Sequence, residues 1–269
     1  MYLILYLRSV LLTNIMITEL FINLIVRPFY NSLIFLVDFI TDDLGLAIII
    51  LTILFRFIIF PLSKSQIKTQ IKMKDIQKPL KELKKKYKDK PQEMGKKMME
   101  LYKENDIKPL AGFLLLFIQL PLLFGFYYVF IRAGLPEINV NFIYSFIPYP
   151  EVVDVNFFGI VLTSKSIILA ILASVTQYFQ LKLLIPKKDS ENAPEKGSME
   201  DVMQGVQTQM VYVMPIIMLF ISYSFGAIVA LYFVTSNVFS IAQEYYIKKT
   251  IRDKKQGNKN DNLVVKKVV

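Results

Sequence analysis

The segment from Val202 to Gln243 contains 42 residues without a single charged side chain. At 1.5 Å per residue, one helix of this length would measure about 63 Å, roughly twice the hydrocarbon thickness of a bilayer. The segment therefore predicts two membrane-spanning helices, 206–225 and 227–247, joined by a tight turn near Ser224-Phe225-Gly226. Pro215 lies inside the first of them, where we expect a kink.

The composition supports the same class of protein. Hydrophobic residues make up 54% of the 269-residue chain, and the mean hydropathy is +0.43. Three further apolar segments of about 20 residues predict spans at 44–63, 109–132 and 166–185. The sequence thus predicts an all-α polytopic membrane protein with five core transmembrane helices. The chain contains no Cys and no His, which excludes disulfides, thiolate metal sites and imidazole catalysis, and we expect no cofactor.

The most hydrophilic stretch, 64–108, holds fifteen Lys and seven acidic residues. Apolar residues recur in it at helical spacing on both sides of a break at Lys88-Asp89-Lys90-Pro91. This pattern predicts two helices that pack along apolar stripes as an antiparallel hairpin. The alternative is a solvated loop whose lysines only set the orientation of the protein in the membrane. The two stripes comprise Ile76, Leu80, Leu83 and Tyr87, and Met94, Met98 and Leu101.

The distribution of charge predicts the topology. By the positive-inside rule, the lysine-rich hairpin is cytoplasmic, and the loop 133–165, which is poor in Lys and Arg, lies outside. The connection 186–205 and the basic tail 248–269 are then cytoplasmic as well, which requires an odd number of core spans. After Gln243 the chain carries eight basic and three acidic residues, a pattern typical of a disordered basic arm.

The N-terminal region consists of two apolar parts. Residues 1–27 are interrupted by Arg8, Asn14 and Glu19, and the segment is an uncleaved anchor, a signal segment or an upstream extension. From 28 to 41, apolar residues gather on one helical face, which favours an amphipathic helix on the membrane surface over burial in a bundle. Thr41-Asp42-Asp43 then ends this helix.

Arg56 is the one charge inside the apolar run 44–62. A guanidinium at this depth costs about 3 kcal/mol or more unless it faces protein or a watery cavity. Other predicted spans supply polar side chains that, together with Arg56, are typical of a hydrated groove. The alternatives are hydrogen bonds that only join helices and, for Arg56, snorkelling to the cytoplasmic interface. The candidate groove residues are Arg56, Thr52, Gln119, Gln177, Tyr232, Ser236 and Asn237, with Thr52 one turn from Arg56 and Ser236 one turn from Tyr232.

No catalytic constellation is present in the predicted spans. Intramembrane proteolysis would need paired Asp, a Ser with a base, or a metal cluster, and the spans contain none of these. Acyl or glycosyl transfer would need buried acid–base pairs. The sequence indicates a protein that moves or positions a substrate and is not an enzyme.

Several segments resemble the YidC/Oxa-type membrane protein insertases, in the same order along the chain. Residues 45–56 (GLAIIILTILFR), followed by Phe60-Pro61-Leu62, are similar to the first core span of that family. Gln119-Leu120-Pro121 is similar to its second span, and 231–243 (LYFVTSNVFSIAQ) to its last. The resemblance covers about 28–250 and points to the compact bacterial members, which lack a large external domain.

The resemblance implies five core helices around a hydrophilic groove, open to cytoplasm and lipid and closed outside, with a cytoplasmic helical hairpin. It maps the groove arginine to Arg56 and groove-lining residues to Thr52 and Tyr232. The expected function is insertion and folding of nascent integral membrane proteins; a membrane channel or transporter subunit that uses the same groove is the alternative. The expected location is a bacterial plasma (inner) membrane. The expected partners are nascent membrane proteins, the lipid bilayer, the ribosome through the basic tail, and targeting factors and the secretion channel through the hairpin.

Overall fold

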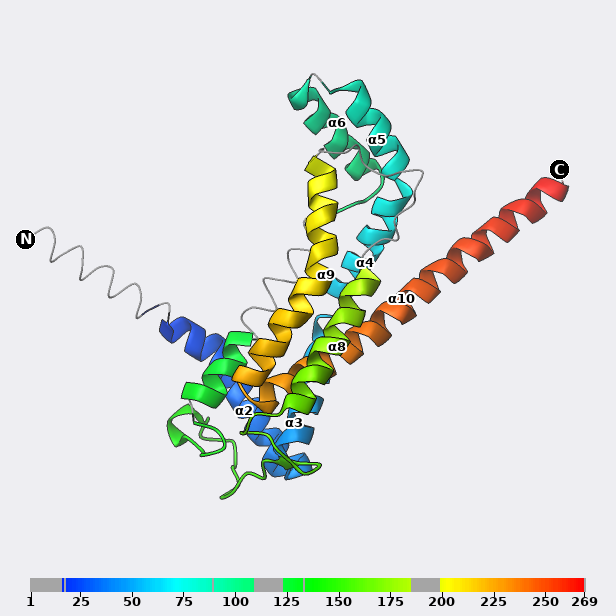
Figure 1. Ribbon diagram of the computed structural model, residues 1–269. Coiled ribbons are helices and arrows are strands. Elements are labelled where there is room, and N and C mark those ends of the chain that lie inside the picture. Colours follow the sequence, from blue (N-terminus) through cyan, green and yellow to red (C-terminus); the bar gives the residue numbers. More distant parts are fainter. Residues whose placement is uncertain are drawn as a thin grey trace, which may run out of the picture.

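Helices form nearly all of the regular structure in the computed structural model (Figure 1). It describes residues 16, 18–88, 90–108, 123–132, 134–184 and 199–268, without the side chains of 131–132, 184, 199–207 and 254–268. The elements are η1 (Ile22–Val26), α2 (Arg27–Leu36), η2 (Val37–Thr41), α3 (Leu44–Ile58), α4 (Phe60–Asp75), α5 (Gln77–Lys86), α6 (Pro91–Glu104), η3 (Tyr128–Arg132), η4 (Val140–Phe142), β1 (Asn156–Phe157), β2 (Ile160–Val161), α8 (Ile167–Leu184), α9 (Met199–Ser224) and α10 (Ala227–Val268).

Apolar helices long enough to cross a bilayer confirm the class of membrane protein. In the described part of the chain, Thr18–Thr41 and Ala227–Asp253 each have the required length and hydropathy. Helices α3 and α4 together form a third such stretch, which bends by 59° at the break between them. Ile167–Leu183 and Thr208–Ser224 are shorter apolar helices. The predicted span 109–132 lies mostly outside the described residues.

Helix boundaries follow from local capping. Asp42, with a φ of 52°, ends η2, and Asp43 begins α3 by accepting hydrogen bonds from the backbone N–H groups of Gly45 (2.6 Å) and Leu46 (3.1 Å). Such side-chain caps satisfy N–H groups that have no partner within the helix. At the other end of the chain, Gly226 (φ 94°) separates α9 from α10, because glycine adopts this left-handed conformation without steric cost.

Two helices extend further than the sequence predicts. The sequence predicts a helix at 28–41, but in the structure the helical stretch begins at Thr18 and continues to Thr41. This stretch is long enough to span a membrane. Helix α10 continues through Val268 at one end of the molecule, where the sequence predicts a disordered arm (Figure 1). This basic stretch, 248–269, contains no Pro and holds seven Lys, a residue with high helix propensity.

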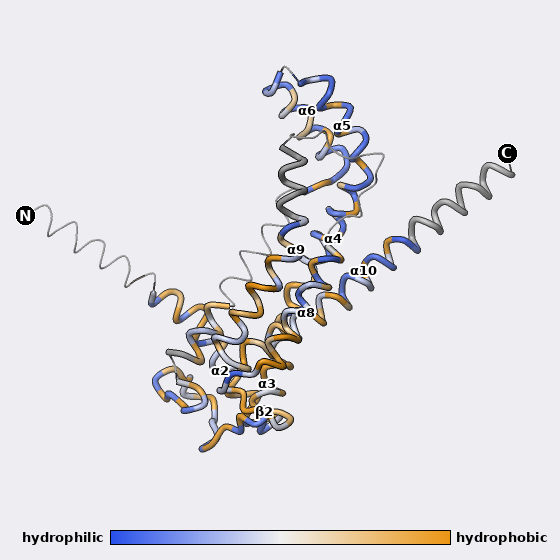
Figure 2. Tube along the Cα trace, viewed as in Figure 1, coloured by the Kyte–Doolittle hydropathy of each residue, from blue (hydrophilic) through white to orange (hydrophobic). Residues whose placement is uncertain are grey.

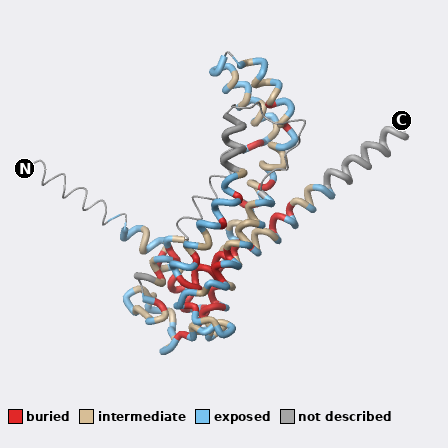
Figure 3. Tube along the Cα trace, viewed as in Figure 1, coloured by how far each residue is buried: buried red, intermediate tan, exposed pale blue. Residues whose placement is uncertain are grey.

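The buried core lies where α2, α3 and α10 meet (Figure 3). Helix α10 packs against both α3 and α8, and α8 packs in turn against α9. Small residues such as Ala47, Ala173 and Ala230 are fully buried and allow the helices to approach closely. The core therefore fixes the position of α10 relative to α3, the two helices that carry most of the candidate groove residues.

The loop after η4 connects the starts of α3 and α10. The backbone N–H of Leu44 donates to the carbonyl oxygen of Asp154 (3.0 Å), next to the two-stranded hairpin β1–β2. The N–H groups of Ala227 and Ile228 donate to the carbonyls of Ser164 (2.8 Å) and Leu162 (3.1 Å). One short segment thus fixes the ends of two helices that are distant in sequence.

The polar helices α5 and α6 form a hairpin that lies apart from the apolar body (Figure 2). The turn between them falls at the break that the sequence indicates, and Ile76 and Leu80 from the first apolar stripe are buried. Lys72 of α4 reaches the end of α6, where its Nζ donates to the carbonyl of Asn105 (2.9 Å) and pairs with Asp106 (3.4 Å). The hairpin is therefore joined to α4 at its base.

Candidate functional site

Arg56 lies in the last turn of α3 with only 8% of its surface exposed. Its Nε donates to the Ser236 hydroxyl of α10 at 3.0 Å, and its terminal nitrogen Nη2 donates to the same oxygen. Ser236 is itself 1% exposed. The structure thus brings together two of the predicted groove residues, which lie 180 positions apart in the sequence.

The charge of Arg56 has no counter-ion in the described part of the chain. No ion pair joins its guanidinium to a described carboxylate, and the hydroxyl of Ser236 is a neutral acceptor. Burial among apolar helices strengthens the field of such a charge, because the local dielectric constant is low. The site therefore presents a cation that favours the approach of an anionic group.

Thr52 and Tyr232 occupy the next turn along each helix. Thr52 is buried one turn before Arg56, and its hydroxyl donates to the carbonyl of Ile48 at 2.6 Å. Tyr232 is buried one turn before Ser236, and its ring packs against Phe126 with 4.3 Å between ring centroids. Both residues therefore lie on the same helical faces as the Arg56–Ser236 contact.

Asn237 connects α10 to α8. Its Nδ2 donates to the hydroxyl of Thr176 (3.2 Å) and to the carbonyl of Ala173 (3.3 Å). Gln177, the neighbour of Thr176, is half-buried on α8, and its side chain forms no hydrogen bond with another described residue. Gln119, the remaining predicted groove residue, lies outside the described residues.

Glu244 is a buried site residue that the sequence analysis missed. Its side chain is 3% exposed and pairs with Lys248, whose Nζ also donates to the carbonyl of Leu183 at the end of α8 (2.8 Å). The sequence contains a pattern that points to Glu244. Polar residues recur every four positions and share one face of α10, namely Tyr232, Ser236, Ser240 and Glu244. Glu244 falls inside the predicted span 227–247, but it ends the uncharged run, and the pattern of charge alone does not tell that it is buried.

We expect Lys248→Ala to destabilise the protein by about 1–3 kcal/mol, because the buried Glu244 carboxylate would lose its cation. The loss of unfolding free energy is smaller than for a fully buried ion pair, because the Lys248 side chain is 39% exposed. Thermal unfolding in detergent micelles measures the effect. Lys249→Ala is the matched control, because Lys249 is exposed and forms no ion pair in the described residues. Equal melting temperatures for the two variants would contradict the prediction.

The described residues contain no group of three or more acidic side chains that could hold a metal ion, and the sequence has no His or Cys. Arg56 is not among the residues that line either of two cavities on the surface, which lie between α2 and α3 and on α6. The arrangement around Arg56 is suited to binding an anion.

Comparison with known proteins gives the family. The model of a family described as 60Kd inner membrane protein matches residues 35–255. The chain belongs to this family. This match includes α3 to α9 and the first part of α10, up to residue 255, and therefore all the candidate groove residues.

Three similar proteins share one name. A protein named Membrane protein insertase YidC from Oceanobacillus iheyensis is 33% identical over 218 residues, which cover 80% of this chain and 78% of that protein. One of the same name from Fusobacterium nucleatum is 31% identical over 225 residues, which cover 84% of this chain and 96% of that protein. A third protein of this name, from Clostridium perfringens, is 33% identical over 219 residues, which cover 78% of this chain and 83% of that protein.

Proposed function

We infer that this protein is a membrane protein insertase, which moves segments of nascent membrane proteins into the bilayer without catalysing a chemical reaction. Relatives of this name cover most of the chain, and the chain covers more than three quarters of each of the three relatives described above. The apolar helices of the described residues place the protein itself in a membrane. The expected membrane is a bacterial plasma membrane.

The observation that carries the mechanism is the buried contact between Arg56 of α3 and Ser236 of α10. Two nitrogens of the guanidinium donate to one neutral hydroxyl, and no described carboxylate neutralises the charge. A carboxylate accepts stronger hydrogen bonds from arginine than a hydroxyl does. We propose that an acidic residue in the N-terminal tail of a substrate replaces Ser236 as the acceptor while the tail moves into the membrane.

The remaining polar side chains would form the rest of the groove. Thr52, Tyr232 and Asn237 lie within two turns of the Arg56–Ser236 contact, and Gln119 and Gln177 are predicted to face the same space. The amide nitrogen Nε2 of Gln243 is buried with no hydrogen-bond partner among the described residues, which favours a hydrated interior. Water and these side chains would lower the cost of carrying a polar tail into the bilayer.

The hydrophobic effect would supply the driving force. The apolar helix of the substrate gains about 25 cal/mol for each Å² of apolar surface that leaves water. We propose that this helix enters the lipid beside the groove while its tail interacts with Arg56. Five core helices would enclose the groove, namely α3, 109–132, α8, α9 and α10.

The charge distribution supports a proposed orientation and set of partners. The lysine-rich hairpin α5–α6 lies apart from the apolar body and would be cytoplasmic, where targeting factors and the secretion channel could bind it (Figure 2). The basic end of α10 would also be cytoplasmic and would bind ribosomal RNA. Such binding would weaken strongly with salt, because it depends on neutralised phosphates.

Reconstitution tests the proposed function. The purified protein in liposomes is supplied with a single-span substrate that carries an acidic N-terminal tail, and external protease is then added. We expect the tail to be protected in these liposomes and not in empty ones. Protection equal to that of empty liposomes would contradict insertion, and solute flux in the same liposomes would favour the channel or transporter.

A further inference from the structure

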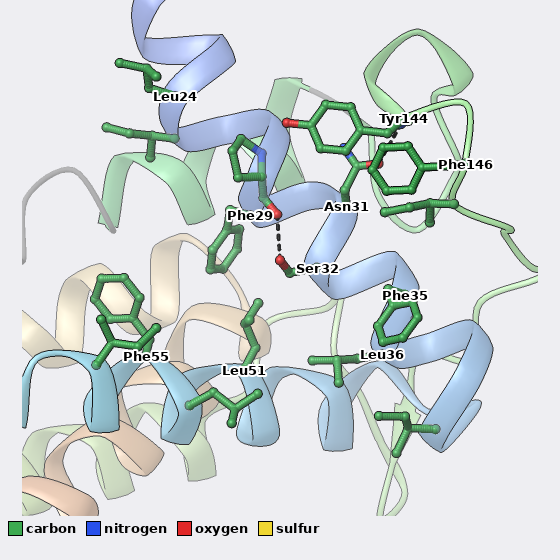
Figure 4. Close-up of a pocket in the computed structure, with 16 residues that line it drawn as sticks. Leu24, Phe29, Asn31, Ser32, Phe35, Leu36, Leu51, Phe55, Tyr144 and Phe146 are labelled. Atoms are coloured by element: carbon green, nitrogen blue, oxygen red, sulfur yellow. Dashed lines mark hydrogen bonds between the residues drawn. The ribbon is translucent and has the colours of Figure 1, made fainter.

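A second site lies between α2 and α3, away from Arg56. It is a cavity of about 910 Å³ with apolar side chains on both helices (Figure 4). Phe29 of α2 and Leu51 of α3 lie on opposite sides of the space, and Phe55 lies at one end of it. Tyr144 and Phe146 from the loop 134–155 stack on each other (5.5 Å between ring centroids) and form the other end.

The few polar groups that line this cavity already have partners. Nδ2 of Asn31 donates to the carbonyls of Arg27 (2.7 Å) and Phe142 (2.8 Å), and its Oδ1 accepts from the backbone N–H of Tyr144 (2.7 Å). The Ser32 hydroxyl donates to the carbonyl of Pro28 (2.7 Å), as Figure 4 shows. A polar ligand would find few groups with which to bond, so the lining is suited to hydrocarbon.

The cavity opens to the side of the molecule. Ile58 and Phe146, which line it, are 73% and 78% exposed. Its two walls belong to Thr18–Thr41 and to the α3–α4 pair, both of which have the hydropathy of membrane spans. Water is disfavoured in an open apolar space at hydrocarbon depth, and this favours apolar matter from the membrane as the occupant.

The size of the cavity distinguishes between two apolar occupants. A transmembrane helix about 10 Å wide and 30 Å long occupies roughly 2,400 Å³, more than twice the cavity volume. A lipid acyl chain is thin and flexible and can follow a narrow, irregular space between crossing helices. We propose that the cavity between α2 and α3 is a binding site for acyl chains of a bilayer phospholipid.

Acyl chains in this position would support the contact between the two helices. The hydrogen bonds of Asn31 to the loop, together with the buried residues of α2, hold that helix in place. Its cavity side, by contrast, packs on α3 only in part. A bound chain would supply the missing apolar contacts. This site is separate from the Arg56 contact and does not depend on the proposed insertion activity.

Fluorescence quenching tests the proposal, because the chain contains no Trp. Phe55→Trp places a reporter in the cavity. Phe220→Trp gives a lipid-exposed reference on α9, where Phe220 is 66% exposed, and Phe126→Trp gives a fully buried one. Each variant is checked for a melting temperature close to that of the parent and reconstituted in phosphatidylcholine liposomes with an increasing fraction of lipid brominated on its acyl chains.

We expect bromine to quench the Phe55→Trp reporter at least half as strongly as the Phe220→Trp reporter. Without acyl chains in the cavity the quenching would be weaker, because Phe55 is half-buried between two helices. Quenching no stronger than that of Phe126→Trp would overturn the proposal. Chemical crosslinking of the same liposomes would then show whether a second copy of the chain fills the cavity, an outcome that also overturns it. None of these measurements depends on whether the protein inserts substrates.

Discussion

Arg56→Ala should lower the rate at which a substrate with an acidic N-terminal tail is inserted by about 10- to 100-fold. A hydrogen bond to a charged partner contributes about 1.5–3 kcal/mol, and a difference of 1.4 kcal/mol corresponds to a factor of ten in rate. The proposed mechanism replaces the Ser236 hydroxyl by a substrate carboxylate, which needs the guanidinium. Protease protection of the tail in liposomes, followed over time, measures the rate.

Two controls separate the charge of Arg56 from its packing. Arg56→Lys keeps the charge and loses the planar geometry of the guanidinium, so we expect a loss smaller than that of Arg56→Ala. A substrate whose tail lacks acidic residues should respond little to either variant. Equal rates for the parent protein and Arg56→Ala on the acidic tail would remove Arg56 from the mechanism while leaving insertion itself intact.

Gly45→Val should destabilise the fold by about 1–3 kcal/mol, because overpacking at a close contact forces neighbouring groups to move. A Cβ atom at Gly45 would lie 2.8 Å from the Cβ of Phe157 and nearer still to its ring. Phe157 belongs to β1, beside the residues that connect α3 to α10. We expect a melting temperature about 3–10 °C below that of the parent in detergent micelles.

The double variant Gly45→Val with Phe157→Ala tests the cause of that loss. If the ring is responsible, the valine should cost less stability when Phe157 is absent, which a double-mutant cycle measures as a coupling energy. Gly95→Ala is the matched control, because a Cβ atom at this position on α6 would have no heavy atom within 4 Å apart from its own stretch of helix. That substitution should raise stability slightly through helix propensity. Additive effects in the cycle would contradict the proposed clash.

Much of the fold follows from patterns that are local in sequence. The uncharged run 202–243 predicts two helices with a turn near Gly226, and the structure has a turn there because glycine tolerates its φ of 94°. The pairing of Arg56 with Ser236 was not predictable as a contact. Each helix offered several polar residues, and only the packing of α3 against α10 determines which two of them meet.

Other features depend on tertiary context that the sequence patterns do not contain. Glu244 ends the uncharged run, but the sequence does not tell that it is buried or that Lys248, whose Nζ also donates to the carbonyl of Leu183 in α8, neutralises it. The cavity between α2 and α3 was not foreseen, because a hydrophobic pattern identifies an apolar face and does not tell how completely a neighbour covers that face. The surface helix at 28–41 stays a prediction for the same reason.

Photocrosslinking from within the proposed groove tests the central claim most directly. A photoreactive phenylalanine analogue replaces Tyr232, which is buried one turn from Ser236, and a second variant carries it at the exposed residue Phe220 of α9. A substrate arrested during insertion into liposomes is then illuminated. We predict that its acidic tail crosslinks to position 232 and not to position 220. A crosslink of the tail at 220 alone, or equal crosslinking at both positions, would contradict a groove between α3 and α10.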